Sequence, residues 1–337
     1  MRYILEDFSH EKGLHSDTSS LRDLFAHAGH DFPEPFFFGI GEGLGFSFHD
    51  GGNGKFPLVT GRTGTLEVDS RISHTLGCSL KISTSTSPTK AQELLVSKIR
   101  AGQPVMMHVD AYYLRYLHSK AHFGAYSVVA TGVDEDAGIA RIADYTRKGL
   151  VDLSLSELAT ARASAYRPFP PKHRWFDYHI LDEIPVDKPL VMGAIGRNAL
   201  EMLNSPVRNN GVGGIYFLAN CIYHWKEKYG KDLGFICRTV RDAIEGFGTG
   251  GGCFRNLYAE FLEYASNEIG IDELSYAADG YCHVGAMWSQ AAKLLSEVEC
   301  GCSSVSETAD YINQIASREH ELQVSLLTTA NLCCRRK

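Results

Sequence analysis

The sequence lacks long apolar runs and any excess of basic charge. No window approaches the roughly 18 consecutive apolar residues of a membrane-spanning helix. The N-terminal MRYILEDFSHEKG has neither the apolar core nor the cleavage site of a signal peptide. The formal net charge is -7, whereas nucleic-acid-binding proteins usually carry a basic surface. These absences favour a cytoplasmic enzyme that acts on small molecules, amines among them, and argue against a nucleic-acid or membrane partner.

Paired cysteine motifs are missing as well. The chain has 9 cysteines, and an odd number without an export signal indicates reduced thiols. Neither Cys300-Gly301-Cys302 nor the adjacent Cys333 and Cys334 has the paired CxxC spacing of a zinc site. We therefore expect no bound metal.

Length and hydrophobic periodicity predict two domains, because 337 residues exceed the roughly 150 of a typical domain. In the first part, helical and strand-like patterns alternate. The helices are expected at 17–28, 90–101 and 155–164, with Ser154 as the cap of the last. The strands are expected at 36–48, 75–84, 104–110, 125–134, 138–144 and 173–180.

From Pro189 onward strand signals vanish and helical periodicity dominates. The expected helices cover 189–204, 211–228, 236–246, 253–268, 279–298 and 306–327. The charged, proline-containing segment 182–189 predicts a linker. The chain is therefore predicted to be α+β, with an α/β domain over 1–185 and an all-helical domain over 186–337.

Ser16, within HEKGLHSDTSSLRDLF (residues 10–25), stands where an apolar helical pattern begins. The start of a helix offers free N–H groups and positive partial charge, which stabilise an alkoxide or an oxyanion. Serine is also a favoured N-cap, so both interpretations stay open. His10 lies where papain-like enzymes keep an oxyanion-hole donor, with a solvent-facing loop histidine as the alternative. His15, next to Ser16, is expected to point away from it and to be a poor base.

Two glycine-rich segments resemble phosphate loops only superficially. GIGEGLG (39–45) is followed by neither a helix nor a Lys-Ser/Thr pair, so its glycines are expected to bend the backbone into a strand. GFGTGGG (246–252) precedes a helix whose N–H groups could hold a phosphate. Close helix packing is the favoured interpretation there, and Arg255 is the one nearby charge that could contact a ligand.

Polar residues gather at predicted strand ends in the central part of the chain. A triad needs a base at the start of one strand and an orienting carboxylate on the next. Tyr126 and Asp144 have that relative placement, and His122 lies one loop away. Ordinary strand alternation with surface histidines is the competing interpretation. The cluster comprises His108, Asp110, His118, His122, Tyr126 and Asp144.

Several motifs together resemble the butirosin-biosynthesis acyltransferase family. The segment HEKGLHSDTSSLRDLFAHAGHDFPEPFFFGIGEGLGFSF is similar to the family's opening, and DAYYLRY (110–116) and HFGAY (122–126) are similar to later motifs. GTGGGCFRNLYAEFLEYA resembles the uncharacterised helical domain that usually follows. The resemblance implies a papain-like domain of the bacteriocin-leader peptidase type. It further implies aminoacyl transfer from a carrier-protein thioester to an amine by a Cys-His-Asp triad, with no cofactor beyond the donor's phosphopantetheine arm.

The sequence departs from the family pattern at two triad positions. The family cysteine aligns with Ser16 and the family histidine with Tyr126, while Asp144 is kept. A serine here is also what an engineered acyl-enzyme trap would carry. An unassisted serine hydroxyl is a weak nucleophile, and loss of triad members typically lowers the rate by about 10⁴ or more. Either another base, such as His122, has been recruited, or the site performs other chemistry.

The leading hypothesis is acyl transfer in a natural-product pathway. Ser16 would attack or hold the acyl group, His122 or Tyr126 would relay the proton, and Asp144 would orient the relay. The expected partners are a carrier protein or another thioester donor and a small amine or alcohol. The helical domain would cap the cleft or form a homodimer. The residues expected to bind substrate or oxyanion are His10, His15, Asp110 and Tyr113.

Other functions stay open beside this hypothesis. The fold could serve a non-covalent catalyst of cyclisation, condensation or elimination, with Tyr126 and His122 as acid and base. It could also serve a pseudoenzyme that has lost its triad and only binds a ligand or partner. A peptidase is the weakest alternative, since nothing in the sequence indicates a peptide groove.

Overall fold

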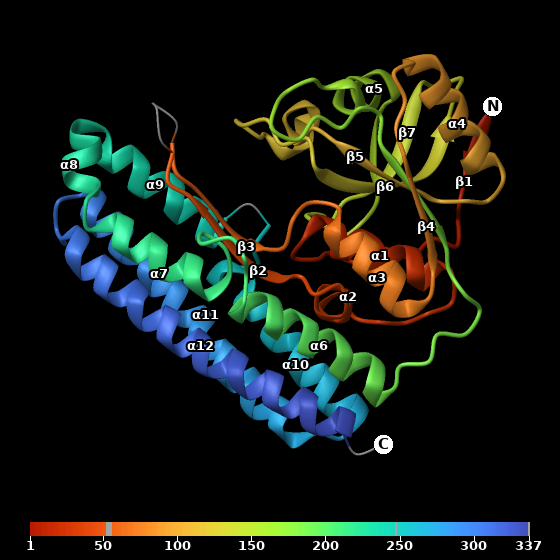
Figure 1. Cartoon of the computed structure of the whole chain (residues 1–337). Helices are drawn as coiled ribbons and strands as arrows, with labels where there is room; N and C mark the ends of the chain where they lie inside the picture. Colours follow the sequence, from red (N-terminus) through yellow and green to blue (C-terminus); the bar gives the residue numbers. More distant parts are fainter. Residues whose placement is uncertain (52–55, 247, 336–337) are drawn as a thin grey trace. The chain divides into compact units, whose positions relative to one another are not determined.

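The computed structural model describes residues 1–51, 56–246 and 248–335. Two compact units account for the chain. Unit 1 consists of Met1–Phe37 and Ile72–Ile184, and unit 2 consists of Phe38–Arg71 and the chain from Pro185 onward. Unit 1 is mixed and unit 2 is mainly helical (Figure 1), which confirms the α+β class. Among the helices of the described residues, none combines the length and the apolar character needed to cross a membrane.

An antiparallel sheet forms the centre of unit 1 (Figure 1). Its strands follow the order β4-β9-β5-β6-β7-β8, and β1 pairs with the other end of β6. Val109 pairs with Tyr126 in the β5–β6 register, so β5 ends and β6 begins at the same edge of the sheet. The strands are β1 (Arg2–Ile4), β4 (Ser79–Ser83), β5 (Val105–Val109), β6 (Tyr126–Asp134), β7 (Ile139–Ala143), β8 (Val151–Ser154) and β9 (Trp175–His179).

Helices α4 and α5 of unit 1 start at capping serines, Ser87 and Ser154. Helix α1 packs against β6 and buries Leu21, Leu24 and Phe25. Ser154 accepts a hydrogen bond from the Glu157 amide, which confirms it as the cap of α5. The helices are α1 (Ser16–His27), α4 (Pro88–Arg100) and α5 (Leu155–Ala163), with short turns η1 (Ala111–Tyr113) and η2 (Arg115–Leu117). The borders between the units fall inside α2 (Glu34–Ile40) and α3 (Glu67–Leu76).

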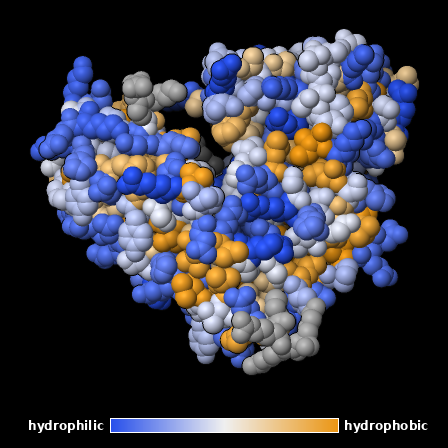
Figure 2. All heavy atoms as spheres, in the orientation of Figure 1, coloured by the Kyte–Doolittle hydropathy of each residue, from blue (hydrophilic) through white to orange (hydrophobic). Residues whose placement is uncertain are grey.

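Unit 2 combines the β2–β3 hairpin with a group of helices around a buried aromatic core. Trp288 is fully buried and stacks on Phe46 of β2. Outside this core, Figure 2 shows mainly hydrophilic residues over α8 and the neighbouring turn η3. The elements are β2 (Leu44–His49), β3 (Leu58–Arg62), α6 (Lys188–Leu203), α7 (Gly211–Ile222), α8 (Trp225–Tyr229), η3 (Gly230–Asp232), α9 (Leu233–Glu245), η4 (Gly252–Phe254), α10 (Arg255–Ile269), α11 (Asp272–Glu299) and α12 (Val305–Arg335).

The hairpin segment 38–71 belongs to unit 2, although the expected first domain over 1–185 includes it. Its backbone carbonyls find their donors on the helices: Asn198 donates to the Leu44 carbonyl at 2.7 Å, and Arg255 donates to those of Gly45 and Gly61 at 3.1 and 3.0 Å. Buried carbonyls need such partners, which joins the hairpin to unit 2.

The strand predicted at 36–48 is wrong in its first part. Residues 34–40 form helix α2, and only β2 is extended. Pro35 stands in the first turn, where its missing N–H costs nothing, and the aromatic run that suggested a strand is buried in the helix. A Cβ at Gly39 would lie 2.0 Å from the Phe261 ring, so this glycine allows close packing and no ligand approaches it. β3, β8 and α3 were not predicted.

Arg255 is not available to a ligand. Its guanidinium forms a fully buried pair with Glu319, with N–O distances of 2.8 and 2.9 Å. Trp288 donates its indole N–H to the same carboxylate at 2.9 Å. In the preceding glycine segment, a Cβ at Gly252 would lie 2.8 Å from the Gly285 backbone. Close helix packing, the favoured interpretation of that segment, is confirmed.

Candidate active site

Ser16 is the first residue of α1, and a buried carboxylate shapes the turn before it. Glu34 accepts hydrogen bonds from the amides of Leu14 and His15 at 2.9 and 2.8 Å, and from the Thr18 hydroxyl at 3.0 Å. Burial raises the pKa of Glu34 despite these donors. Over the described ranges, neither the amide nor the hydroxyl of Ser16 has a hydrogen-bond partner. Ser16 therefore presents a donor and a hydroxyl that the fold itself does not use.

The first turn of α1 is fastened to the start of β6. Asp17 accepts a hydrogen bond from the Ser127 hydroxyl at 2.5 Å, and Ser127 directly follows Tyr126. The His15 ring lies 3.2 Å from the Thr18 hydroxyl and 3.6 Å from an Asp17 oxygen. His15 is thus directed to its own helix, as expected for a residue that cannot serve Ser16 as a base.

Tyr126 and Asp144 form a direct pair, as their sequence placement predicted. The Tyr126 hydroxyl lies 2.9 Å from both carboxylate oxygens, and Tyr116 donates to one of them at 2.5 Å. Thr146 adds its amide at 2.8 Å and its hydroxyl at 2.7 Å. These contacts fill the roughly four acceptor positions of a carboxylate, so the Asp144 side chain is fully engaged.

The tyrosines around Asp144 keep their protons. Burial, followed by the negative charge of Asp144, raises the pKa of Tyr126 and of Tyr116 far above the ordinary value. The same two causes raise the pKa of Tyr145 to about 12, and a hydrogen bond with Tyr126 opposes the rise. A phenol that donates to a carboxylate and holds its proton cannot act as a general base near neutral pH. Tyr126 therefore donates a hydrogen bond to Asp144, and its use as a proton relay for Ser16 stays a prediction.

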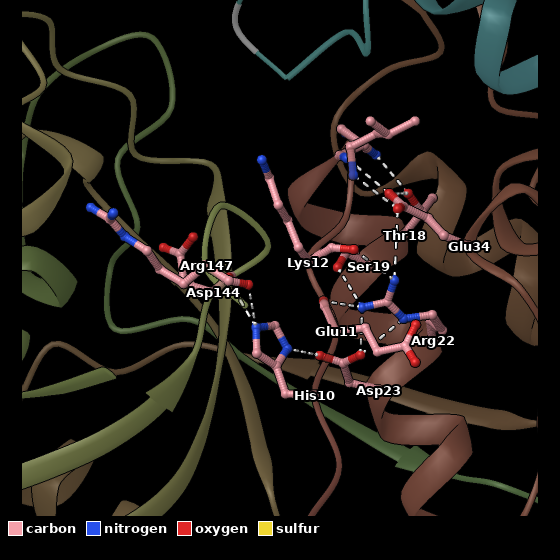
Figure 3. Close-up of polar contacts among 12 residues, drawn as sticks. His10, Glu11, Lys12, Thr18, Ser19, Arg22, Asp23, Glu34, Asp144 and Arg147 are labelled. Atoms are coloured by element: carbon pink, nitrogen blue, oxygen red, sulfur yellow. Dashed lines mark hydrogen bonds and ion pairs between the residues drawn. The ribbon is translucent and has the colours of Figure 1, made fainter. Parts of the chain in front are cut away.

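His10 connects three segments and has no ring nitrogen left for an oxyanion (Figure 3). Its Nδ1 lies 2.5 Å from the Asp23 carboxylate, and its Nε2 lies 3.1 and 3.2 Å from the carbonyls of Asp144 and Arg147. Burial is the largest single influence and lowers the pKa of His10, but the hydrogen bond to Asp23, the charge of Asp23 and the Asp144 carbonyl together raise it overall. The His10 side chain is buried, so it is not the solvent-facing histidine of the alternative interpretation, and it ties the loop to α1.

The segment leading to Ser16 is further fixed by Arg22. Its guanidinium donates to the carbonyls of Glu11 and Lys12 and to the Ser19 hydroxyl (Figure 3). It also lies 2.8 Å from Asp23, the partner of His10. Arg22 of α1 therefore holds in place the loop that precedes Ser16.

A second polar centre surrounds Asp110, and His122 belongs to this centre. His122 Nδ1 lies 2.8 Å from Asp110 Oδ2, and the Ser164 hydroxyl donates to the same oxygen at 2.6 Å. The His122 ring stacks on Tyr166 at a centroid distance of 3.4 Å, and the Tyr113 ring lies 5.6 Å away. The structure thus brings Asp110, Tyr113 and His122 together as one centre, and Tyr126 with Asp144 as another.

Several residues of both centres escaped the sequence prediction. These residues, which contact predicted ones, are Glu34, Tyr116, Thr146 and Ser164. Tyr116 closes the DAYYLRY run, which the prediction used only for family resemblance. Thr146 had a usable signal, because an Asp two residues before an amide often folds into an Asx turn, as Asp144 does here.

The fold and the two centres define an α+β protein with polar groups at the sheet edge where β5 ends and β6 begins. Residues 156–326, just over half of the chain, match the model of a domain of unknown function, DUF4872, and the chain belongs to that family. Residues 15–145 match a second model, butirosin biosynthesis protein H, N-terminal. No curated protein matches the chain.

These matches confirm the predicted resemblance in outline. The N-terminal model includes Ser16, His122, Tyr126 and Asp144, whereas His10 lies before it. Its range also contains the hairpin 38–71 that structurally belongs to unit 2, and the second model begins inside unit 1 at residue 156. Family borders and compact units therefore do not coincide in this chain.

Proposed function

We propose that this protein acts in antibiotic biosynthesis and transfers an acyl or aminoacyl group from a carrier-protein thioester to an amine or hydroxyl. The family match at residues 15–145 supports the pathway. The observation that carries the reaction is Ser16, whose amide and hydroxyl are both unused by the described part of the fold at the first turn of α1. In this proposal Ser16 and Tyr126 occupy the positions of the family's cysteine and histidine, in a domain of papain-like type.

The transfer proposed here is direct, without an acyl-serine intermediate. Ser16 has no base beside it in this proposal, because Tyr126 keeps its proton and Asp144 is fully engaged. Its amide and hydroxyl would instead donate to the thioester carbonyl oxygen, which gains negative charge as the acceptor attacks. The phosphopantetheine arm of the donor supplies the thioester, and no other cofactor is needed.

Product formation from a panel of acyl-pantetheine and acyl-carrier thioesters with amines and alcohols tests the proposal. Direct transfer predicts an amide or ester product, no mass increase on the protein, and residual activity in Ser16→Ala. Removing one oxyanion donor typically lowers the rate by about 10² to 10³. A stable mass adduct on Ser16 would replace direct transfer by a covalent route, and no product across the panel would overturn the proposed activity.

A second candidate function is binding without catalysis. The observation that favours it is that Tyr126, which this proposal places at the position of the family's histidine, retains its proton. A pseudoenzyme predicts saturable binding of an acyl-pantetheine thioester in calorimetry with no turnover. Turnover at any rate above the protein-free reaction decides against it.

A further inference from the structure

His122 is held so that one edge of its ring stays open. Tyr166 stacks on the ring at 3.4 Å with an interplanar angle of 7°, and Tyr112 lies against it at 4.0 Å. The Nδ1 edge faces Asp110. The side chain is nevertheless 20% exposed. Because Tyr112 and Tyr166 lie against the ring and Asp110 contacts its Nδ1 edge, we infer that the exposed part includes the opposite edge, which carries Nε2.

Asp110 determines which ring nitrogen is the base. Its Oδ1 accepts from the amides of Tyr112 and Phe123 at 3.1 and 3.0 Å, and its Oδ2 accepts from Ser164 and His122. Burial raises the pKa of Asp110, but these hydrogen bonds outweigh it and lower the pKa overall. An ionised carboxylate only accepts, so His122 keeps its proton on Nδ1. The lone pair of the neutral ring is then on Nε2.

The His122–Asp110 pair lies at the same sheet edge as the Asp144 centre. Asp110 follows Val109, the residue paired with Tyr126 across β5 and β6. The connection between these strands supplies Tyr116 to Asp144 and His122 to Asp110. An open hollow of about 540 Å³ borders Tyr113, Ser164 and Tyr166, a volume within the range of small-molecule sites. An acceptor in this hollow would adjoin the pair.

We propose that His122, oriented by Asp110, is the general base for the acceptor, a role that rests on the proposed acyl transfer. The acceptor amine attacks the thioester carbon through its lone pair, and a carbon–nitrogen bond forms. One N–H proton moves to His122 Nε2 while the carbon–sulfur bond breaks. The same proton then passes to the departing sulfur, which leaves as the free thiol of the donor arm, and His122 returns to its neutral form. The Asp144 centre takes no part in this proton transfer.

Transfer kinetics of His122→Asn test the base. The asparagine amide can occupy the place of Nδ1 and keep the contact with Asp110, while the basic nitrogen is lost. General-base catalysis contributes typically about 10² to 10⁴, so we expect the rate with the fastest thioester and amine pair to fall by about 100-fold or more. The matched control is His118→Asn, because His118 is an exposed histidine of the same connection and its backbone is left-handed.

Chemical rescue separates a base from a structural residue. His122→Ala empties the slot between the Tyr112 and Tyr166 rings, and added imidazole fits that slot with Asp110 still in place. We expect imidazole to restore transfer in His122→Ala and to restore none in the His122→Ala/Asp110→Asn double variant. Circular dichroism confirms folding, and if the alanine variant unfolds, the transfer kinetics of His122→Asn decide alone.

The outcomes distinguish this inference from the function on which it rests. No product from the unchanged protein overturns both proposals. Product formation with an unimpaired His122→Asn variant overturns the base and leaves the acyl transfer intact. A third measurement needs no substrate: diethyl pyrocarbonate, which modifies accessible neutral imidazoles, should label His122 at neutral pH in peptide mass spectra. An unlabelled His122 would contradict the open Nε2 edge.

Discussion

The Asp144 and Asp110 centres are two buried carboxylates at one edge of the same sheet, and they differ in their ring partners. Asp144 is surrounded by the hydroxyls of Tyr116 and Tyr126, whose protons are held in place. Asp110 contacts Nδ1 of His122, whose side chain is 20% exposed. A carboxylate with a phenol forms a static hydrogen bond, whereas a carboxylate with an imidazole can move a proton. In the proposed transfer the proton therefore moves at the Asp110 centre, and the Asp144 centre has a structural role.

The largest expected effect comes from placing a histidine beside Asp144. In the Ser16→Cys/Tyr126→His double variant, a histidine beside Asp144 can activate a thiol at the start of α1. Because triad groups are worth about 10⁴ in rate, we expect covalent acylation by a thioester to rise at least about 10³-fold over Ser16→Cys alone. Intact-protein mass spectrometry over time measures it. Equal adduct rates in both variants would show that position 126 cannot reach position 16.

Removing the Asp144 carboxylate should destabilise the protein strongly. In Asp144→Ala the buried hydroxyls of Tyr116 and Tyr126 and the Thr146 amide lose their acceptor. Unsatisfied buried donors cost about 1–3 kcal/mol each, so we expect a loss of about 3 kcal/mol in the free energy of unfolding. Urea titration followed by circular dichroism gives the value. Asp144→Asn, which keeps one acceptor oxygen, is the control and should lose less.

His10 should make part of the stability depend on pH. Its folded-state pKa is raised above 6.5, so its contribution is complete below about pH 6.5 and is lost as the pH rises through the folded value. We expect His10→Gln to lower the free energy of unfolding by about 2 kcal/mol near pH 5.5, the size of a charged hydrogen bond. The difference should shrink toward alkaline pH. A constant difference across pH would contradict a charged His10.

The smallest effect is expected for Tyr126→Phe. The variant loses one hydrogen bond to Asp144, while Tyr116 and Thr146 still donate to the carboxylate. The free energy of unfolding should therefore fall by about 1 kcal/mol. Transfer should stay within about 10-fold of the unchanged protein, in contrast to His122→Asn. A fall of 100-fold or more in the transfer rate of Tyr126→Phe would show that the Asp144 centre takes part in proton transfer.

Patterns within single segments were predictable, whereas pairings between distant segments were not. The buried face of α1, the Ser154 cap and the long helices α11 and α12 follow from local periodicity and capping chemistry. The Tyr126–Asp144 pair followed from the placement of two residues on neighbouring strands. Helix α2 was missed because its buried aromatic run has the composition of a strand, and tertiary packing decided its conformation.

The assignments that failed at the site share one cause. A histidine in a polar loop has several possible partners, and the fold selects one of them. His10 contacts Asp23, thirteen residues later, and the carbonyls of two residues far along the chain. His122 found Asp110 across the strand connection. No local rule distinguishes Asp110 from Asp144 as the partner of His122, because that choice depends on where the connection between β5 and β6 places the ring.

The hairpin segment 38–71 has a consequence for the order in which the chain matures on the ribosome. Its strands are synthesised early, but the helices that supply donors to the Leu44, Gly45 and Gly61 carbonyls follow only after Pro185. Domains tend to fold as they emerge from the ribosome. Unit 1 can therefore fold before the helices that contact the hairpin have been synthesised. We expect nascent chains halted near residue 184 to carry an exposed, protease-sensitive β2–β3 segment that becomes resistant only when the last helices have emerged.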